Sequence, residues 1–307
     1  MTGATRKVVF IGSCSFSGST ALDLIVGTSE GAISLGEIGL AFNPRREVHF
    51  TRECGCMREN CDFWRGIIDQ EEVDLHLRIF EKHEASILSD STKDPFWIRR
   101  RKAELERCGS EVINILLWRN PEEVRNSFKK RGRVNDWEKS WVNYYKLYFS
   151  LIDSFVVIPF EAIHSGDGGL ERRLEIIGIG GTSKKFWENE THSLFGNVTA
   201  KKSFFAIDSP QYRTLLERQN KSGTSEMEHR AIFQSDIEKE NSMLIPSHVE
   251  EIRKFLEDND VLVTNGGQTS APSNLKMGRI QCAARGFVRR LRSVFHHHKG
   301  VSITRDI

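Results

Sequence analysis

Short runs of β-branched and apolar residues recur along the chain, and segments with apolar residues at helical spacing separate them. The runs predict buried strands at 7–12, 32–35, 112–118 and 154–159. The helical spacing predicts helices at 19–26, 71–88, 95–107 and 249–262 and in the stretch containing Trp137, Trp141, Tyr144, Tyr145 and Tyr148. Strands that alternate with helices favour an α/β fold with a mainly parallel central sheet flanked by helices.

One helix start is marked with particular clarity after the strand at 112–118. Asn120 is a typical N-cap residue, Pro121 suits the first helical position, and Glu122 and Glu123 place acids in the first turn. The aromatic stripe that begins at Trp137 is typical of a helix packed into the core. Residues 39–64 lack periodicity and are predicted to form a long loop, and residues 90–94 a short polar one.

Composition divides the chain of 307 residues into a body and a tail. Residues 1–265 are expected to form one domain, 266–275 a linker and 276–307 a basic tail. The tail has eight Lys or Arg and one acid, so the rest of the chain carries a net charge of −5 against +2 overall. No signal-peptide pattern and no apolar run of about 20 residues is present, so a cytoplasmic protein is expected.

The tail contains a predicted basic amphipathic helix from Ile280 to Phe295. Such helices bind anionic membrane surfaces, which would make the protein peripheral on a membrane, or calmodulin-like partners. The segment also fits the pattern I-Q-x-x-x-R-G-x-x-x-R of calmodulin-family ligands, and packing on its own domain or on a second copy is a third interpretation. Nucleic acid is not among the expected partners.

A loop of small residues, Gly12 to Thr20, lies between the first predicted strand and helix. Backbone N–H groups at a helix start, together with Ser and Thr hydroxyls, form a P-loop-like anion site. A nucleotide-binding P-loop needs Gly-Lys-Ser/Thr after four intervening residues, whereas here five residues separate Gly12 from Gly18, and Ser19 replaces the Lys. A kinase is therefore disfavoured, and a tight turn without a ligand is the simpler alternative.

The segment Ser17, Gly18, Ser19, Thr20 resembles the 5′-phosphosulfate loop of sulfotransferases that use 3′-phosphoadenylyl sulfate (PAPS), including bacterial sulfotransferase-like proteins. The resemblance implies that these four residues bind the phosphosulfate. The family usually has Arg or Lys just before this motif, where this chain has Phe16. Arg119 at a strand end and Ser127 eight residues later resemble the family's 3′-phosphate site, which suits the planar donor fork of arginine.

Two further motifs resemble tyrosylprotein sulfotransferases, a branch of this family. The stretch Lys93-Asp-Pro-Phe96 implies that Lys93 reaches the transferring group, although an exposed Lys before a helix is the alternative. The Gly-Glu pair ending at Glu37 implies that Glu37 is the catalytic base. A surface Glu, or one paired with Arg45 or Arg46, is the alternative, and Leu40 departs from the family's downstream Arg.

The stretch from His192 to Asn197 is similar to a His-x-x-x-Gly-Asn loop that closes over the nucleotide in bacterial sulfotransferase-like proteins. The resemblance implies that Asn197 and the following Lys201 or Lys202 meet the phosphates, whereas a solvated basic pair is the alternative for the lysines. His192 is the second candidate for the base.

Together these motifs imply an enzyme that transfers a sulfuryl group from PAPS to an acceptor hydroxyl, expected on a saccharide or other small molecule, and releases PAP. An inactive PAPS-binding adaptor is the main alternative because of Phe16. No metal is assigned to the reaction. Cys54, Cys56 and Cys61 form a cluster for which reduced thiols, a disulfide and a zinc site with His49 as fourth ligand all stay open.

Overall fold

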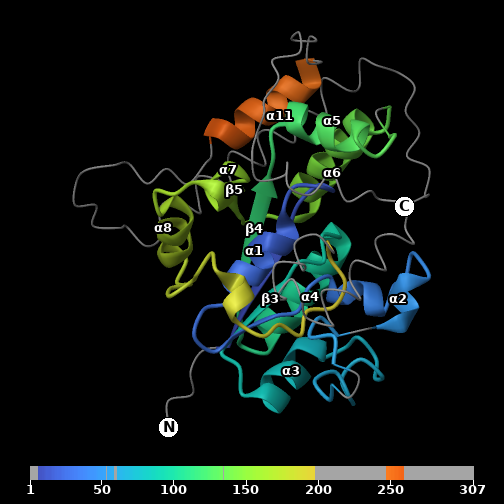
Figure 1. The fold of residues 1–307 in the computed structure, drawn as a ribbon, viewed down its shortest axis with the longest axis vertical. Helices are drawn as coiled ribbons and strands as arrows, with labels where there is room; N and C mark the ends of the chain where they lie inside the picture. Colours follow the sequence, from blue (N-terminus) through green and yellow to red (C-terminus); the bar gives the residue numbers. More distant parts are fainter. Residues whose placement is uncertain (1–5, 53, 59–60, 134, 198–246, 259–307) are drawn as a thin grey trace.

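The computed structural model describes residues 6–52, 54–58, 61–133, 135–197 and 247–258, and Figure 1 shows their arrangement. The strands are β1 (Lys7–Gly12), β2 (Ala32–Ser34), β3 (Ile87–Asp90), β4 (Glu111–Trp118) and β5 (Val156–Pro159). The helices are α1 (Ser19–Val26), η1 (Ile38–Ala41), α2 (Val48–Thr51), α3 (Leu75–His83), α4 (Pro95–Arg107), α5 (Pro121–Lys129), α6 (Trp137–Leu151), α7 (Glu161–His164), α8 (Gly169–Ile176), η2 (Phe186–Glu188) and α11 (Ser247–Asp258).

The strands form one parallel sheet in the order β2-β3-β1-β4-β5, which confirms the predicted α/β class with a parallel central sheet. β1 lies at the centre, where Lys7 pairs with Ile87 of β3 on one side and with Glu111 of β4 on the other. From β1 the chain builds β2 and β3 on one side and then crosses to build β4 and β5 on the other. The carboxyl end of β1 is therefore the switch point where open α/β sheets place their ligands.

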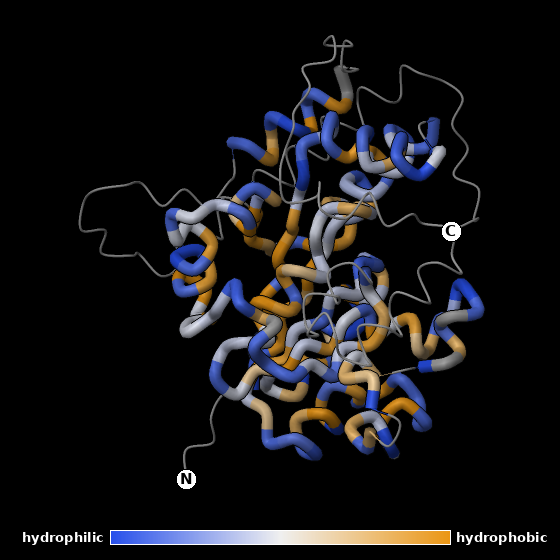
Figure 2. Tube along the Cα trace, in the orientation of Figure 1, coloured by the Kyte–Doolittle hydropathy of each residue, from blue (hydrophilic) through white to orange (hydrophobic). Residues whose placement is uncertain are grey.

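Side chains alternate between the two covered faces of the sheet. In β1, Val8 and Phe10 belong to one apolar core, whereas Val9 and Ile11 belong to the other, and all four are fully buried. The first core lies under α3, α4, α6 and α11, and the second under α1, α7 and α8. Figure 2 shows the hydrophobic colouring concentrated along the central strands. Burial on both sides explains why β1 and β5 appear in the sequence as hydrophobic runs.

Helix α6 supplies much of the first core and confirms the interpretation of its aromatic stripe. Trp141, Tyr145 and Tyr148 are fully buried, and Phe149 stacks edge-on against Phe255 of α11, with ring centroids 5.2 Å apart. Figure 1 shows α11 beside α5 and α6. Burial of each such ring contributes about 2–3 kcal/mol to the free energy of unfolding. The aromatic side chains of α6 therefore form a stable layer next to the loop that follows β1.

The start of α5 also follows its sequence signals. Asn120 caps the helix through a hydrogen bond from the Glu122 N–H to its side-chain oxygen, 2.9 Å long, and Pro121 occupies the first turn. Asp94 caps α4 in the same way by accepting from the Phe96 N–H at 2.9 Å. These two caps fix the positions where the chain leaves β4 and β3.

The predicted helix at 71–88 and polar loop at 90–94 were wrong in part. The helix α3 ends at His83, where Glu84 adopts a left-handed conformation with φ 51°, and residues 87–90 form β3. Ile87 and Leu88 pair with Lys7 and Val8 of β1. These two apolar residues therefore belong to a strand, although their helical spacing predicts a helix. The predicted long loop at 39–64 contains η1 and the short α2.

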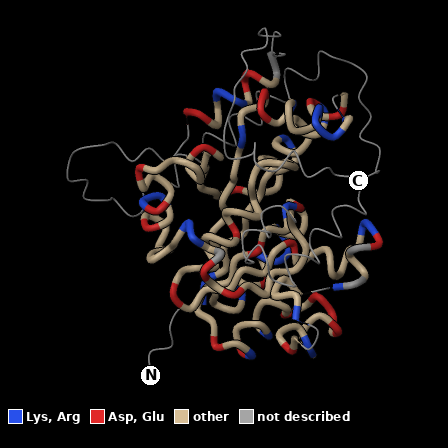
Figure 3. Tube along the Cα trace, in the orientation of Figure 1, with Lys and Arg blue, Asp and Glu red and all other residues tan. Residues whose placement is uncertain are grey.

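Charged side chains lie mainly on the outer helices and turns, while most of the length of the strands is uncharged (Figure 3). Within the described ranges, none of the helices combines the length and the apolar character that crossing a bilayer requires. The linker at 266–275 and the amphipathic segment Ile280–Phe295 lie outside the described residues.

Candidate active site

The residues singled out by the sequence motifs follow the carboxyl ends of four adjacent parallel strands. The loop 13–18 follows β1, Arg119 follows β4, Glu37 follows β2 and Lys93 follows β3. The carboxyl ends of parallel strands share one edge of the sheet. Side chains that are far apart in the sequence therefore meet at this edge.

The loop between β1 and α1 wraps closely against the aromatic layer of α6. A Cβ atom on Gly12 would lie 2.3 Å from Cε2 of Tyr148, so only glycine allows the chain to leave β1 at this point. Gly18 caps α1 with φ 83°, a left-handed conformation that favours glycine. The Ser13 hydroxyl is buried with no hydrogen-bond partner in the described part of the chain, and the Ser17 hydroxyl is buried beside that of Tyr145.

The segment from His192 to Asn197 lies over the start of α1. The backbone N–H of Asn197 donates a hydrogen bond of 3.0 Å to Oγ1 of Thr20, and Gly196 lies against the same side chain. The structure thus brings Asn197 next to the predicted phosphosulfate loop. Lys201 and Lys202 lie outside the described residues.

Arg119 connects the predicted 3′-phosphate residues to the loop. Its Nη1 donates to Oγ of Ser127 at 3.3 Å and to the carbonyl oxygen of Phe16 at 3.1 Å. Its Nε donates to Glu123 at 2.6 Å, and its guanidinium lies 4.1 Å from the centroid of the Phe160 ring. Arg119 and Ser127 are therefore adjacent, as their spacing predicts, and Glu123 holds the guanidinium in place.

Phe16 contacts a cation that the sequence interpretation missed. The guanidinium of Arg131 lies 4.1 Å from the centroid of the Phe16 ring, a cation–π contact, and its Nη1 donates to the carbonyl oxygen of Ser127 at 2.8 Å. Arg131 stands four residues after Ser127, in the turn that follows α5. That spacing was the available signal. Two arginines thus contact Phe16, Arg119 at the carbonyl oxygen and Arg131 at the ring.

Glu37 and Lys93 are in direct contact. Nζ of Lys93 donates to Oε1 of Glu37 at 2.7 Å, and the side chains are 25% and 17% exposed respectively. Arg45, the partner considered for Glu37, pairs with Asp94 instead at 3.4 Å. Both side chains are partly exposed, so a substrate can reach them, and the ion pair between them fixes their positions at the edge of the sheet.

Lys93 is tied to the loop through Tyr144. The Tyr144 hydroxyl donates to the carbonyl oxygen of Lys93 at 2.9 Å and lies beside the Ser13 backbone. Burial raises the pKa of Cys14 to about 12, and a backbone hydrogen bond from Ser15 and the charge of Lys93 oppose that rise. Lys93 therefore acts electrostatically on the loop after β1.

The backbone at Glu37 is fixed by a buried carboxyl group on α1. Asp23 accepts from the Ser34 hydroxyl at 2.5 Å and from the Gly36 N–H at 3.1 Å. Burial raises the pKa of Asp23 from 3.8 to about 7, although its hydrogen bonds oppose the rise. The sequence motifs did not point to Asp23, because it belongs to none of them. The available signal was an acidic residue among the apolar, buried positions of α1.

Leu194 extends the sheet edge beside Glu37. Its N–H donates to the Leu35 carbonyl at 2.9 Å, and its carbonyl accepts from the Glu37 N–H at 2.9 Å. Gly36 and Cys54 each form a β-bridge with Leu194. The backbone of Glu37 is thus held from one side by Asp23 and from the other by Leu194.

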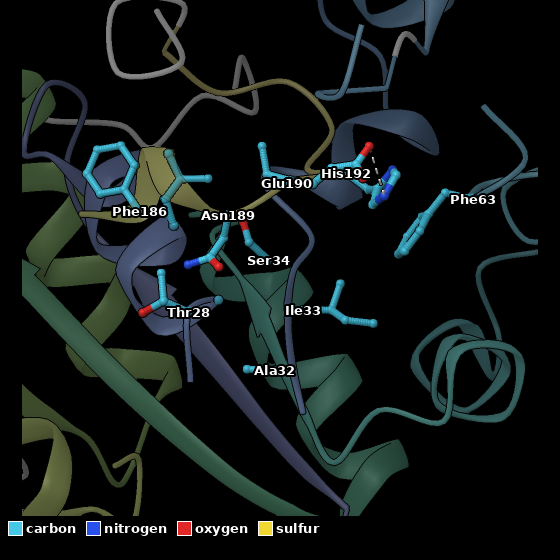
Figure 4. A pocket seen from close by; sticks show the side chains of 12 residues that line it. Thr28, Ala32, Ile33, Ser34, Phe63, Phe186, Asn189, Glu190 and His192 are labelled. Carbon is cyan, nitrogen blue, oxygen red and sulfur yellow. Dashed lines mark ion pairs between the residues drawn. The ribbon is translucent and has the colours of Figure 1, made fainter. Parts of the chain in front are cut away.

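A small pocket lies beside β2, and the residues that line it do not include Glu37, Lys93 or the 13–18 loop (Figure 4). It encloses about 70 Å³ and is lined by residues that include Thr28, Ile33, Phe186, Asn189 and His192. Ligand pockets for drug-sized molecules usually measure about 300–1,000 Å³, so this hollow is too small for a nucleotide.

The histidine next to the three cysteines is His192 and not His49, which the sequence suggested. Cys54, Cys56 and Cys61 meet at His192, whereas Nδ1 of His49 accepts from the backbone N–H groups of Arg45 and Arg46. The ring of His192 faces the cysteines, with Nδ1 next to Sγ of Cys54 and Cys61. The three cysteines are free thiols.

Solved structures that are similar to the chain include two sulfotransferase domains. The sulfotransferase domain from the curacin biosynthetic pathway aligns with a TM-score of 0.48 and 14% identity over 82% of this chain and 98% of that one. The sulfotransferase domain from the Synechococcus PCC 7002 olefin synthase aligns with a TM-score of 0.48 and 13% identity over 94% and 95%. No protein-family model and no curated protein matches the chain. Because the sequence identity and the TM-scores are low, a reaction can be assigned to this chain only from its own residues at the strand ends.

Proposed function

We propose that the protein transfers a sulfuryl group from PAPS to an acceptor hydroxyl. One observation carries the proposal. The four sets of residues that resemble sulfotransferase motifs follow four adjacent strands, and direct contacts join them in two pairs, Arg119 to the 13–18 loop and Lys93 to Glu37. Residues that follow parallel strands share this edge in any case, so the two direct contacts are what support the proposal.

The donor site is built from the loop and from Arg119. We assign the 5′-phosphosulfate to Ser17, Gly18, Ser19 and Thr20, where backbone N–H groups at the start of α1 favour negative charge. The 3′-phosphate is assigned to Arg119 and Ser127, which already share a hydrogen bond. The contact between Arg119 and the Phe16 carbonyl makes the two anion sites continuous.

The transfer step is assigned to Glu37 and Lys93. The acceptor oxygen forms a bond to sulfur as the bond from sulfur to the phosphate oxygen breaks, and the acceptor proton passes to Glu37. Lys93 stabilises the charge that develops on the departing oxygen. In the free protein these two groups neutralise each other, so the arriving sulfuryl group takes the place of Glu37 as the partner of Lys93.

The acceptor class is a further part of the proposal. We propose a saccharide hydroxyl, which presents a neutral oxygen that needs a base to become a good nucleophile. The position of Glu37, partly exposed at the sheet edge, allows an acceptor to approach from solvent.

Nucleotide protection is the first test. PAP should raise the unfolding temperature while ATP with Mg²⁺ should not, because a ligand that binds only the folded state stabilises it. Protection by ATP with Mg²⁺ alone would favour a kinase. A screen of saccharides with labelled PAPS then separates an enzyme from an inactive PAPS-binding adaptor, which would bind PAP but transfer nothing.

A further inference from the structure

Three cysteines and one histidine meet in a cluster outside the proposed active site. The distances from Sγ of Cys54 are 3.4 Å to Sγ of Cys56, 3.5 Å to Sγ of Cys61 and 3.3 Å to Nδ1 of His192. Sγ of Cys61 lies 3.4 Å from the same nitrogen, and all four atoms lie within 4.8 Å of one another. We propose that these four side chains bind a structural Zn²⁺ ion.

The distances match the edges of a tetrahedral zinc site. With Zn–S bonds of about 2.3 Å and Zn–N bonds of about 2.0–2.1 Å, tetrahedral angles place the sulfurs about 3.8 Å apart and each sulfur about 3.6 Å from the nitrogen. Four of the edges in the protein measure 3.3–3.5 Å, so small outward movements of the side chains would admit the ion.

The donor set also points to zinc. Three sulfurs and one imidazole nitrogen make a complete Cys₃His set, which is typical of closed structural sites with no open position for water. A disulfide would need two sulfurs at about 2.05 Å, well short of the separations in this cluster. Zn²⁺ binding instead releases the thiol protons to solvent and leaves the oxidation state of sulfur unchanged.

The surroundings of His192 orient it as a ligand. The Phe63 ring stacks on the imidazole at 4.3 Å with an interplanar angle of 6°, and Trp64 Nε1 donates to the His192 carbonyl at 2.7 Å. Nε2 points to Glu190, with Oε1 at 3.8 Å, and Figure 4 shows this ion pair and the facing Phe63 ring. Zinc-bound histidines commonly direct their other nitrogen to a carboxylate in this way.

The ion would add a side-chain link between two segments that lie far apart in the sequence and already meet at the β-bridge between Cys54 and Leu194. Cys54 and His192 are 138 residues apart, and Leu194 bridges both Cys54 and Gly36 next to Glu37. The zinc site would therefore fix the segment around Leu194, which hydrogen-bonds to the backbone of the proposed base. Its role is structural, because the ligand atoms belong to a cluster separate from Lys93 and the loop after β1.

Metal analysis of the full chain tests the site. Protein purified without chelators and dialysed against excess Zn²⁺ should retain one Zn²⁺ per chain, measured by plasma mass spectrometry. Replacement by Co²⁺ should give the thiolate charge-transfer and strong visible bands of a tetrahedral site. Retention of no zinc, an iron chromophore in its place, or two cluster thiols lost as a disulfide would overturn the proposal.

Ligand variants make the test specific. Cys61→Ser and His192→Ala should lose stoichiometric zinc, whereas His192→Cys should keep it, because a fourth sulfur completes the same tetrahedron. Glu190→Gln should weaken zinc binding about 10–100-fold in chelator competition. Cys108→Ser, at an exposed free cysteine, and His49→Ala are matched controls that should keep the metal. Full zinc in both Cys61→Ser and His192→Ala would refute the site, whether or not PAP binds.

Discussion

Nζ of Lys93 and Oε1 of Glu37 are 2.7 Å apart and neutralise each other at the edge of the sheet. If one transition state uses both groups, Glu37→Gln and Lys93→Ala should each lower turnover by on the order of 10²–10⁴-fold. Single-turnover transfer from labelled PAPS measures the effect. PAP affinity should change little in Glu37→Gln, because we assign that group to the acceptor and not to the nucleotide.

The contact between these groups adds a second expectation. The double variant should lose less than the product of the two single losses, since groups that act as a unit are not additive. Lys102→Ala removes a comparable Lys–Glu pair on the surface of α4 and should leave turnover unchanged. Full activity in Glu37→Gln would exclude Glu37 as the base.

Arg119 should dominate nucleotide affinity. Arg119→Ala removes a charge-assisted phosphate contact and should weaken PAP binding by about 2–3 kcal/mol, which calorimetry measures directly. Glu123→Gln should strengthen binding slightly, because it removes a negative charge next to Arg119 while its amide oxygen can still accept from Nε. Arg133→Ala, at a half-exposed arginine paired with Asp136, is the control. Normal PAP affinity in a folded Arg119→Ala protein would rule out the assigned 3′-phosphate site.

Asp23 should make stability depend on pH. Burial raises its pKa from 3.8 to about 7, so between these values the folded protein holds a proton that the unfolded chain releases. The free energy of unfolding should therefore fall as pH rises from about 4 to 7, and the contribution is fully present only below that window.

Asp23→Asn keeps the hydrogen-bond acceptor for Ser34 and Gly36 but cannot ionise. Its unfolding free energy should fall less steeply over this window, as measured by urea titration at several pH values. Asp69→Asn, at an exposed carboxylate, should retain the wild-type slope. Equal slopes in wild type and Asp23→Asn would show that Asp23 titrates normally in the folded state.

The glycine at the end of β1 should be intolerant of any side chain. Gly12→Ala places a methyl group 2.3 Å from the Tyr148 ring, and overpacking of this kind costs about 1–3 kcal/mol of unfolding free energy. Gly166→Ala, with open space around the new methyl group, should change stability by less than about 0.5 kcal/mol. Equal denaturation midpoints for the two variants would contradict the close packing of the loop on α6.

The strands and capped helices could be predicted because their signals are local. The runs at 7–12 and 112–118 are buried on both faces, and Asn120 with Pro121 defines a helix start within four residues. β3 could not be predicted so easily, because Ile87 and Leu88 become strand residues only through pairing with β1 and β2. A short strand next to a helix has too few residues to show its own period.

In the candidate site too, local spacing could be predicted from the sequence, whereas contacts between distant segments could not. Arg119 and Ser127 lie on one strand end and the next helix, so their spacing alone placed them together. The pairing of Lys93 with Glu37 depended on the order of β2 and β3 in the sheet, which no spacing encodes. His192 replaced His49 in the cysteine cluster for the same reason, since its approach to Cys54 depends on a β-bridge formed by Leu194.

That β-bridge has a consequence for how the protein is made. During synthesis, the loop after β1, Glu37 and Lys93 leave the ribosome early, whereas the Leu194 strand that borders Glu37 emerges much later. Contacts between residues so distant in sequence form late, because closing a long loop costs entropy before any contact compensates for it. A nascent chain that stops short of Leu194 can pair β1 with β3 but leaves one side of Glu37 unsupported. Full support of the proposed base thus depends on synthesis continuing past Leu194.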